Sequence, residues 1–265
     1  MIRSPPSSTG CSLSWTTHPE AFYGISRDEF VAALDEYEQQ LPDLDDDQAV
    51  VGLMRVVAML SREGRDGHQF ALPRPGHEGA VLPLRIYEFA EGVYVTDEAT
   101  VYVRYRNVVR PDITDARELL GAAAVDRLIL DLRQNPGGDN NAFGPLLSLV
   151  QDFAADHRGG LMVVTDRVTF SAVANLATRI EQSTDATFIG EAMGGGLNFW
   201  NDVRWIALDA LPVPMRVGVS TRYWQFATAD DPRLTIAPDV EVPVAAADFF
   251  GGIDPALDAA MTHER

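Results

Sequence analysis

Lysine is absent from the sequence, because all 21 basic residues are arginine. This excludes enzymes that need a lysine as general base, as Schiff-base nucleophile or as the phosphate ligand of a P-loop. Cysteine is nearly absent, and Cys11 is the single one. One thiol can form neither an internal disulfide nor a zinc site built from several cysteines.

Long hydrophobic runs are missing as well. No stretch approaches the roughly 18 consecutive apolar residues of a membrane span, so none is expected. Residues 1–8 read MIRSPPSS and contain no apolar signal-peptide core, although the following Thr-Gly-Cys faintly resembles the end of a lipoprotein signal. We expect no export signal in the chain as written. The location of the protein stays open: it is either cytoplasmic, or exported if an N-terminal leader has been lost.

The charge balance is strongly acidic, with 39 Asp and Glu against 21 Arg and a net charge of −18. Such a surface repels phosphate backbones and anionic membranes, so a nucleic-acid partner is not expected. A basic partner or simple solubility would each explain the excess. The apolar content of 46% permits a sizeable core and argues against wholesale disorder.

Residues 1–16 are rich in Ser and Pro and are predicted to form a flexible leader. Residues 17–70 are predicted to be helical. Ser26 and Glu29 have the spacing of a capping box, and residues 50–60 form a second apolar helical segment. The acidic run 43–47 between them is typical of a helix start.

Residues 71–110 are predicted to be a β-rich connecting region. Its β-branched and aromatic runs lie at 81–87, 92–96 and 100–105. From 111 to 265 strands and helices alternate, with strands expected at 127–132, 161–165 and 187–189 and helices at 143–153 and 172–180. This alternation predicts an α/β core with a mostly parallel sheet covered on both faces.

Catalytic groups in a parallel sheet collect at the carboxyl ends of its strands. After the strand at 127–132 the chain reads Gln-Asn-Pro136-Gly137-Gly138. A turn of this kind lets bare backbone amides approach a ligand, as an oxyanion hole requires. A tight strand-to-helix turn without catalytic function would have the same composition.

Ser171 follows the strand at 161–165 and a short loop, and it stands at the start of the next predicted helix. A hydroxyl at this place benefits from the positive end of the helix, and the amide of Ala172 could stabilise an oxyanion. A serine that merely caps the helix would look the same in the sequence.

Several motifs resemble the C-terminal-processing, or tail-specific, serine peptidase family when taken in combination and order. Residues 131–138 read DLRQNPGG, 169–172 read TFSA, 189–191 read IGE and 236–240 read IAPDV. The similarity covers roughly residues 17–258. It implies a Clp-protease/crotonase-like core preceded by a small helical segment. The tricorn core protease and the interphotoreceptor retinoid-binding protein are relatives of this family.

The resemblance also implies a general base. One branch of the family uses a lysine, near whose expected place this chain has MGGG at 193–196. The tricorn-like branch uses a histidine, and Asp66-Gly67-His68 resembles its Asp-Gly-His motif, with Gln69 where Thr is usual. His68 is therefore the candidate base. His18-Pro19 resembles a pair near the start of this branch that supports the fold or lines the cleft.

The remaining roles follow from the same resemblance. A residue that orients His68 is expected downstream, where Asp231 is preferred and Asp230, Asp239 and Glu191 are alternatives. The amides of Gly138 and Ala172 are expected to form the oxyanion hole. Substrate-binding residues are expected at Gly137, Asn198 and Tyr223, with Trp200 beside them. A peptide or protein substrate is implied, with no cofactor and no metal, and the oligomeric state is left open.

The chain departs from larger relatives in one respect. Residues 69–130 are too few for a complete PDZ domain between the His68 and Asp131 motifs, so specificity for chain termini is not expected from the resemblance alone. Two other functions stay open. One is a non-catalytic binding protein for an apolar or peptide ligand, which needs no Ser171–His68 pair. The other is acyl transfer from a thioester, for which no basic cluster is found to hold nucleotide phosphates.

Overall fold

The chain forms two compact units in the computed structural model, which describes residues 18–61, 66–74, 92–97, 99–121 and 125–264. The first unit comprises Met1–Tyr87 and Asn198–Gln225, and the second comprises Glu88–Leu197 and Phe226–Arg265. The predicted leader at 1–16 and the predicted strand at 81–87 lie outside the described residues.

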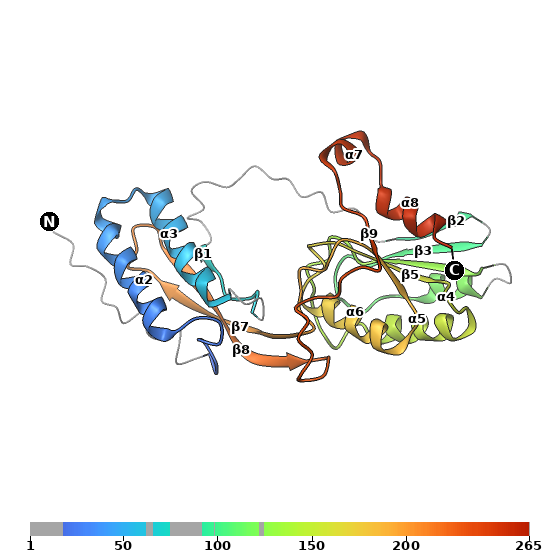
Figure 1. The fold of residues 1–265 in the computed structure, drawn as a ribbon, viewed down its shortest axis with the longest axis horizontal. Coiled ribbons are helices and arrows are strands. Elements are labelled where there is room, and N and C mark those ends of the chain that lie inside the picture. Colours follow the sequence, from blue (N-terminus) through green and yellow to red (C-terminus); the bar gives the residue numbers. More distant parts are fainter. Residues whose placement is uncertain (1–17, 62–65, 75–91, 98, 122–124, 265) are drawn as a thin grey trace. The chain divides into compact units, whose positions relative to one another are not determined.

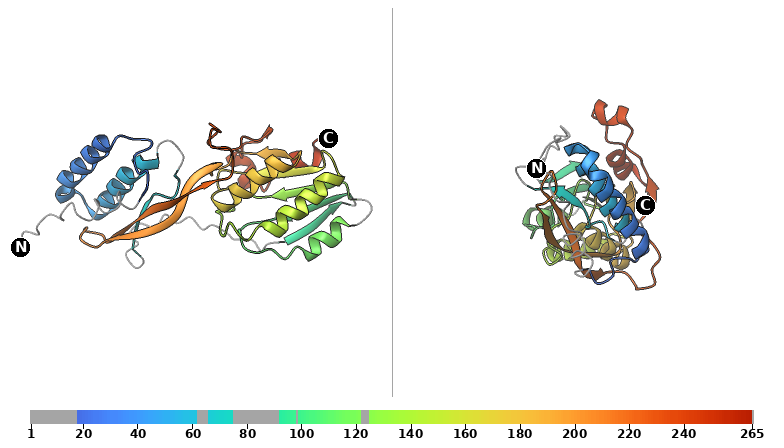
Figure 2. Two further views of the ribbon diagram at one scale, coloured as in Figure 1. Left: turned by 90° about the horizontal axis from the view of Figure 1, so that it is seen from below. Right: turned by 90° about the vertical axis from the view of Figure 1, so that its left-hand side faces the viewer.

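Two helices and a three-stranded antiparallel sheet build the first unit (Figures 1 and 2). The helices are α2 (Arg27–Gln40) and α3 (Asp46–Ala58), followed by the 3₁₀ turns Leu41–Asp43 and Met59–Ser61 respectively. The sheet has the order β1-β8-β7, with β1 at Ala71–Pro73, β8 at Met215–Gln225 and β7 at Asn198–Leu208. Both predicted helical segments are confirmed.

Side-chain caps explain where these helices begin. The Ser26 hydroxyl accepts a hydrogen bond from the Glu29 amide at 3.2 Å, as the capping-box spacing predicts. Asp45 and Gln48 form a complete capping box at the start of α3, with bonds of 2.8 and 3.1 Å. The apolar faces of both helices then share a core with β8. This core includes Phe30, Leu34, Tyr37, Leu53, Val56, Met215, Val217 and Val219.

A six-stranded sheet of order β2-β3-β4-β5-β6-β9 forms the centre of the second unit. Its strands are β2 (Gly92–Asp97), β3 (Thr100–Arg104), β4 (Arg127–Asp131), β5 (Leu161–Thr165), β6 (Thr187–Gly190) and β9 (Val240–Glu241). β2 pairs antiparallel with β3, and every other neighbouring pair is parallel. The predicted α/β class is confirmed.

Helices cover both faces of this sheet (Figures 1 and 2). They are α4 (Thr114–Leu120), α5 (Gly144–Asp156), α6 (Ala172–Ser183) and α8 (Pro255–Thr262), whereas the short helix α7 (Ala246–Gly251) projects from the unit (Figure 1). Leu128 and Leu130 of β4 belong to the core shared with α5 and α6, whereas Ile129 belongs to the core beneath α8. This alternation of side chains across a doubly covered strand explains its continuous apolar sequence.

The division into units differs from the predicted domain boundaries. β2 and β3 lie in the predicted connecting region at 71–110, yet they extend the sheet of the second unit because β3 pairs with β4. β7 and β8 lie in the predicted core at 111–265, yet they belong to the first unit because β8 pairs with β1. The pairing of strands that are distant in sequence therefore decides to which unit each of these strands belongs.

An ion-pair cluster joins the carboxyl end of β4 to α8. Asp131 is fully buried and accepts hydrogen bonds from the Tyr102 hydroxyl at 2.6 Å and from Arg133 Nη2 at 2.7 Å. Arg133 also donates to Asp254 at 2.7 Å, and Asp254 caps α8 by accepting from the Leu257 amide. Burial alone would lower the pKa of Arg133, but hydrogen bonds to Asp131 and Asp254 and their charges outweigh it and raise the pKa above its ordinary value, so the arginine stays charged.

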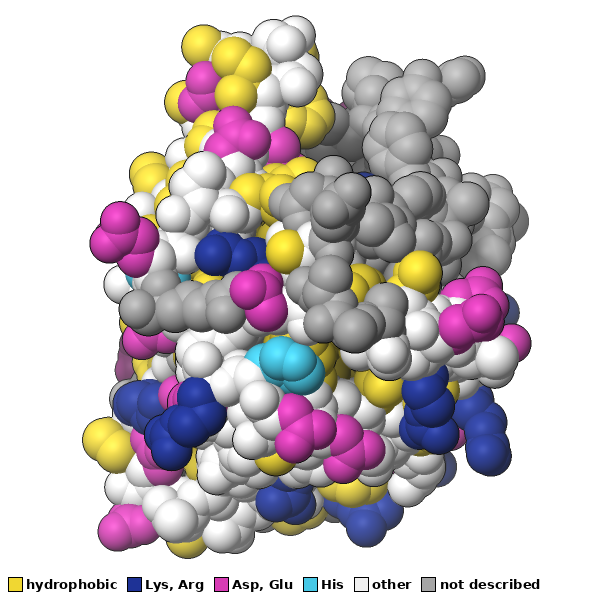
Figure 3. Space-filling model, turned by 90° about the vertical axis from the view of Figure 1, so that its right-hand side faces the viewer, with side chains coloured by type: hydrophobic (Ala, Val, Ile, Leu, Met, Phe, Trp, Pro, Cys, Tyr) yellow, Lys and Arg dark blue, Asp and Glu magenta, His cyan; other side chains and the backbone are white. Residues whose placement is uncertain are grey.

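α7 differs from the other helices because none of its residues is buried. Phe249 and Phe250 are 70% and 85% exposed, and hydrophobic side chains gather on the protruding segment at the top of Figure 3. Among the described helices, none combines the length and the apolar composition that a bilayer crossing requires.

Candidate active site

Ser171 has the backbone conformation of a sharp turn between β5 and α6. Its φ and ψ are 60° and −127°, values that a type II′ turn normally assigns to glycine. Such a conformation costs a side-chain-bearing residue about 1–3 kcal/mol and clusters at functional sites. Ser171 occupies the N-cap position, but its side chain makes no capping hydrogen bond to the described helix α6. Helix capping therefore does not explain this serine.

Gly137 lies directly against Ser171. Its φ is +105°, and a Cβ atom on it would come within 2.7 Å of the Ser171 Cβ and 2.9 Å of the Ala172 nitrogen. Distances below 3.0 Å leave no space for a side chain. The predicted Pro-Gly-Gly turn and the predicted serine are thus neighbours, and glycine is required at this contact.

The Gly138 amide is directed away from the strand segment beside it. Val108 donates to the Gly137 carbonyl and accepts from the Asp139 amide, both at 2.8 Å, in an isolated parallel bridge with Gly138. In such a bridge the partner strand bonds to the residues before and after Gly138, and the N–H group of Gly138 itself points away from that strand. Ala172 begins α6, where the first amides of a helix have no acceptor within the helix. Both predicted oxyanion donors have a suitable local backbone.

Asn135 fixes the glycine turn from beneath. It is fully buried, and its side chain donates to the Tyr105 carbonyl at 2.7 Å and accepts from the Gly137 amide at 2.9 Å. Its own carbonyl accepts from the Phe170 amide at 3.1 Å. One residue therefore links the end of β3, the glycine turn and the loop that carries Ser171.

Asp166 shapes the loop before Ser171. Its carboxylate accepts from the amides of Val168 at 2.9 Å and Thr169 at 3.0 Å, and from the Gln134 amide at 3.1 Å. The Thr169 hydroxyl accepts from the Asp166 amide at 3.0 Å. Sequence reasoning missed both Asn135 and Asp166. The spacing of Asp166 and Thr169 is a turn signal that could have found the second.

The glycine run at 194–196 packs behind this loop. A Cβ atom on Gly195 would lie 2.7 Å from the Ala174 Cβ and 3.1 Å from the Ser171 nitrogen. On Gly194 it would lie 2.1 Å from the Arg167 carbonyl oxygen. The segment that stands near the expected lysine thus supports the backbone of the serine turn instead.

His68 belongs to the first unit, in the segment before β1, and is 9% exposed. Its ring stacks on Phe199 of β7, with ring centroids 5.6 Å apart and an interplanar angle of 15°. Burial lowers the pKa of His68 below 6.5, against the opposing effects of Asp66, a backbone hydrogen bond to Trp200, and Asp202. A neutral imidazole at neutral pH is what a general base requires.

The predicted substrate-binding residues of the first unit lie on the β7–β8 ribbon. Asn198 begins β7 and pairs with Gln225, and Tyr223 pairs with Trp200 across the ribbon. The Trp200 ring lies 5.2 Å from Tyr223 and 4.6 Å from His18, measured between centroids. Tyr223 is 36% exposed and therefore retains surface for a ligand.

Asp231, the preferred orienting residue, forms an ion pair with Arg233 at 2.9 Å within the second unit, and Arg233 also binds Glu181 at 2.7 Å. Hydrogen bonds from Arg233 hold the pKa of Asp231 below its usual value. Of the alternatives, Glu191 pairs with Arg167 at 2.6 Å and Asp239 accepts from the Phe188 amide at 2.8 Å. The orienting role of Asp231 toward His68 stays a prediction.

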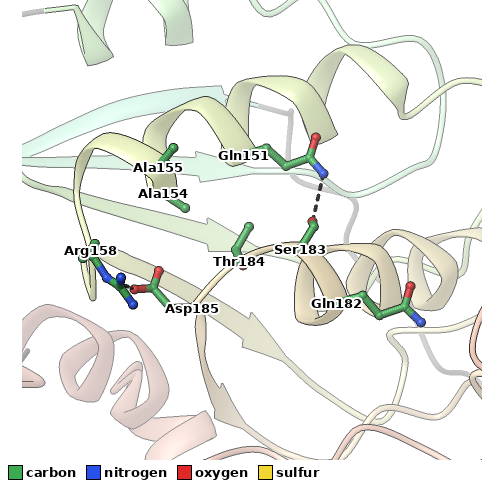
Figure 4. A pocket seen from close by; sticks show the side chains of 8 residues that line it. All are labelled: Gln151, Ala154, Ala155, Arg158, Gln182, Ser183, Thr184 and Asp185. Carbon is green, nitrogen blue, oxygen red and sulfur yellow. Dashed lines mark hydrogen bonds and ion pairs between the residues drawn. The ribbon is translucent and has the colours of Figure 1, made fainter.

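A groove between the carboxyl ends of α5 and α6 contains none of these residues (Figure 4). Its polar side chains bond to one another, as Gln151 Nε2 does to Ser183 Oγ at 2.8 Å and Arg158 does to Asp185 at 3.5 Å. Across the described residues, no three His, Cys, Asp or Glu side chains come together in a set that could hold a metal ion.

Comparison with known proteins shows the fold. No family model matches the chain, and no curated protein matches it. A crystal structure of a candidate peptidase from Parabacteroides merdae superposes with a TM-score of 0.63 at 16% identity, covering 98% of this chain and 96% of that one. A lipoprotein from Streptococcus agalactiae superposes with a TM-score of 0.46 at 13% identity, covering 95% of this chain and 96% of that one. The tricorn protease superposes with a TM-score of 0.38 at 17% identity, covering 62% of this chain and 17% of that one.

Proposed function

We propose that the protein is a serine peptidase in which Ser171 is the nucleophile and His68 is the general base. The observation that carries the proposal is the strained backbone of Ser171, at the start of α6 and against Gly137. Nucleophilic serines on strand-to-helix turns have this kind of conformation, which presents the hydroxyl beside helix amides. The resemblance of the sequence motifs to tail-specific peptidases gives the reaction class.

The reaction proceeds through an acyl-enzyme. His68 accepts the proton of the Ser171 hydroxyl while Oγ attacks the carbonyl carbon of a peptide bond. The amides of Gly138 and Ala172 donate to the resulting oxyanion, and Asp231 remains the proposed orienting residue. The C–N bond then breaks, and the leaving amine takes the proton from His68. His68 then takes a proton from a water molecule as the water oxygen attacks the acyl carbon. The bond between that carbon and Ser171 Oγ breaks, and Oγ takes the proton from His68, which regenerates the hydroxyl and releases the carboxylic acid product.

Covalent labelling with a fluorophosphonate tests the nucleophile. We expect the label on Ser171 in the wild-type protein and on no residue of the Ser171→Ala variant, with peptide mapping by mass spectrometry as the measurement. Ser183→Ala, which removes a hydroxyl at the far end of α6, is the matched control and should label like wild type. A folded wild-type protein that takes no label would reject the peptidase and favour the binding protein.

The labelling rate should persist further into the acid range than it would with a solvent-exposed histidine as the base. A general base must be neutral, and burial lowers the pKa of His68 below 6.5, so the imidazole stays unprotonated further into the acid range than a solvent-exposed histidine. The acid limb of a plot of labelling rate against pH should therefore have its midpoint below 6.5. A midpoint above 6.5 would contradict this environment for the base.

A further inference from the structure

Asp66 is a buried carboxylate whose hydrogen-bonding capacity is filled. Its side chain is fully buried. Oδ1 accepts from the His68 amide at 3.0 Å and the Ser220 hydroxyl at 2.8 Å, and Oδ2 accepts from His18 Nε2 at 3.0 Å and Gln69 Nε2 at 2.9 Å. Burying a carboxylate is costly unless its oxygens are satisfied, and here two donors reach each oxygen.

The contacts of His18 give each of its two ring nitrogens a separate partner. The Glu20 amide donates to Nδ1 at 2.9 Å, so Nδ1 carries no proton. Nε2 therefore carries the ring proton and donates it to Asp66. His18 is only 4% exposed, and its ring lies against Trp200.

This cluster holds the backbone of His68, while β7 holds its ring. Asp66 binds the His68 amide in a local turn and Ser220 in the middle of β8. Two residues along β8, the Gly218 amide donates to the Phe70 carbonyl at 2.8 Å. The ring of His68 stacks on Phe199 and hydrogen bonds to the backbone of Trp200. The Asp66 cluster therefore fixes the backbone of His68, and residues of β7 fix its ring.

We propose that His18, Asp66, Gln69 and Ser220 are positioning residues that hold His68 in the orientation a general base needs. The role rests on the proposed function, because it matters only if His68 removes the proton of Ser171. It also explains two sequence features that the mechanism leaves unused. His18 of the His-Pro pair donates to Asp66, and Gln69, which stands where Thr is usual, supplies another donor.

Two substitutions of His18 separate positioning from simple packing. Glutamine places an N–H group at about the distance of Nε2 and can still donate to Asp66, whereas asparagine is too short to reach it. We expect His18→Asn and Asp66→Asn to slow fluorophosphonate labelling of Ser171 about 100-fold, as a displacement of about 1 Å of a catalytic group can. His18→Gln should restore the rate to within a few-fold of wild type.

The matched control is Tyr37→Phe, which removes a buried hydrogen bond of 2.9 Å to the Ala49 carbonyl elsewhere in the first unit. It should lower the unfolding midpoint but leave the labelling rate unchanged. Because Trp200, Trp205 and Trp224 all lie in the first unit, tryptophan fluorescence reports whether each variant keeps that unit folded.

Folded Asp66→Asn and His18→Asn variants that label at the wild-type rate would overturn the positioning role. If either variant fails to fold, Ser220→Ala decides the question, since it removes one hydroxyl and should slow labelling several-fold. An unchanged rate in Ser220→Ala would then reject the proposal. Failure of the proposed function is separate, because it appears as an unlabelled wild type or as a His68→Ala variant that labels normally.

Discussion

Replacing Gly137 by alanine is expected to slow the reaction of Ser171 strongly. The added methyl group would lie 2.7 Å from the Ser171 Cβ, 2.8 Å from the Phe170 carbonyl oxygen and 2.9 Å from the Ala172 nitrogen. None of these atoms is the end of a flexible side chain, so the serine turn or the glycine turn must move. Alanine at the positive φ of Gly137 would also carry about 1–3 kcal/mol of backbone strain.

We expect Gly137→Ala to slow fluorophosphonate labelling of Ser171 by at least about 100-fold. Gly144→Ala is the matched control, because a Cβ atom at the first residue of α5 has no neighbour within 4 Å. That variant should label like wild type. Normal labelling of Gly137→Ala would mean that the glycine turn does not lie against the reactive serine.

Replacing Asp131 by alanine is expected to cause the largest loss of stability. The substitution leaves the largely buried Arg133 with Asp254 as its remaining carboxylate partner and removes the acceptor of the Tyr102 hydroxyl. Breaking a buried ion pair from one side costs about 3–5 kcal/mol. We therefore expect a loss of this size in the free energy of unfolding, measured in urea by far-ultraviolet circular dichroism.

Arg158→Ala is the control within the same unit, because Arg158 is 87% exposed and pairs with Asp185 at 3.5 Å. A surface pair contributes about 0–1 kcal/mol, so this change should be nearly neutral. A loss below about 1 kcal/mol in Asp131→Ala would show that the Asp131–Arg133–Asp254 cluster does not hold α8. The presence of Asp131 and Arg133 in the DLRQNPGG motif would then need another explanation.

The parallel sheet could be predicted because its strands are short apolar runs. The range predicted for β5, 161–165, agrees with the observed strand, and all five of its residues are buried. β7 and β8 could not be predicted, since charged and exposed residues interrupt both strands. Asp202 within β7 also has a positive φ of 57°, which a strand residue does not ordinarily adopt. The side chain of such a ribbon residue is placed by its partner strand and not by its neighbours in sequence.

The candidate site was only partly readable in the sequence. The position of Ser171 at a helix start follows from local pattern, but its positive φ does not, because serine does not ordinarily adopt that conformation. Gly137 was predicted as a substrate-binding residue, and its contact with Ser171 depends on how β4 and β5 pair. The Asp66 cluster depends on residues as distant as His18 and Ser220, which only the tertiary fold brings together.

The rate of fluorophosphonate labelling of Ser171 in the His68→Ala variant, relative to wild type, tests directly whether His68 activates the serine. A general base contributes about 10²–10⁴-fold to a proton-transfer step. We therefore predict a loss of this size in a protein whose circular dichroism and tryptophan fluorescence match wild type. Equal rates in the two proteins would contradict the assignment of His68 as the base that activates Ser171.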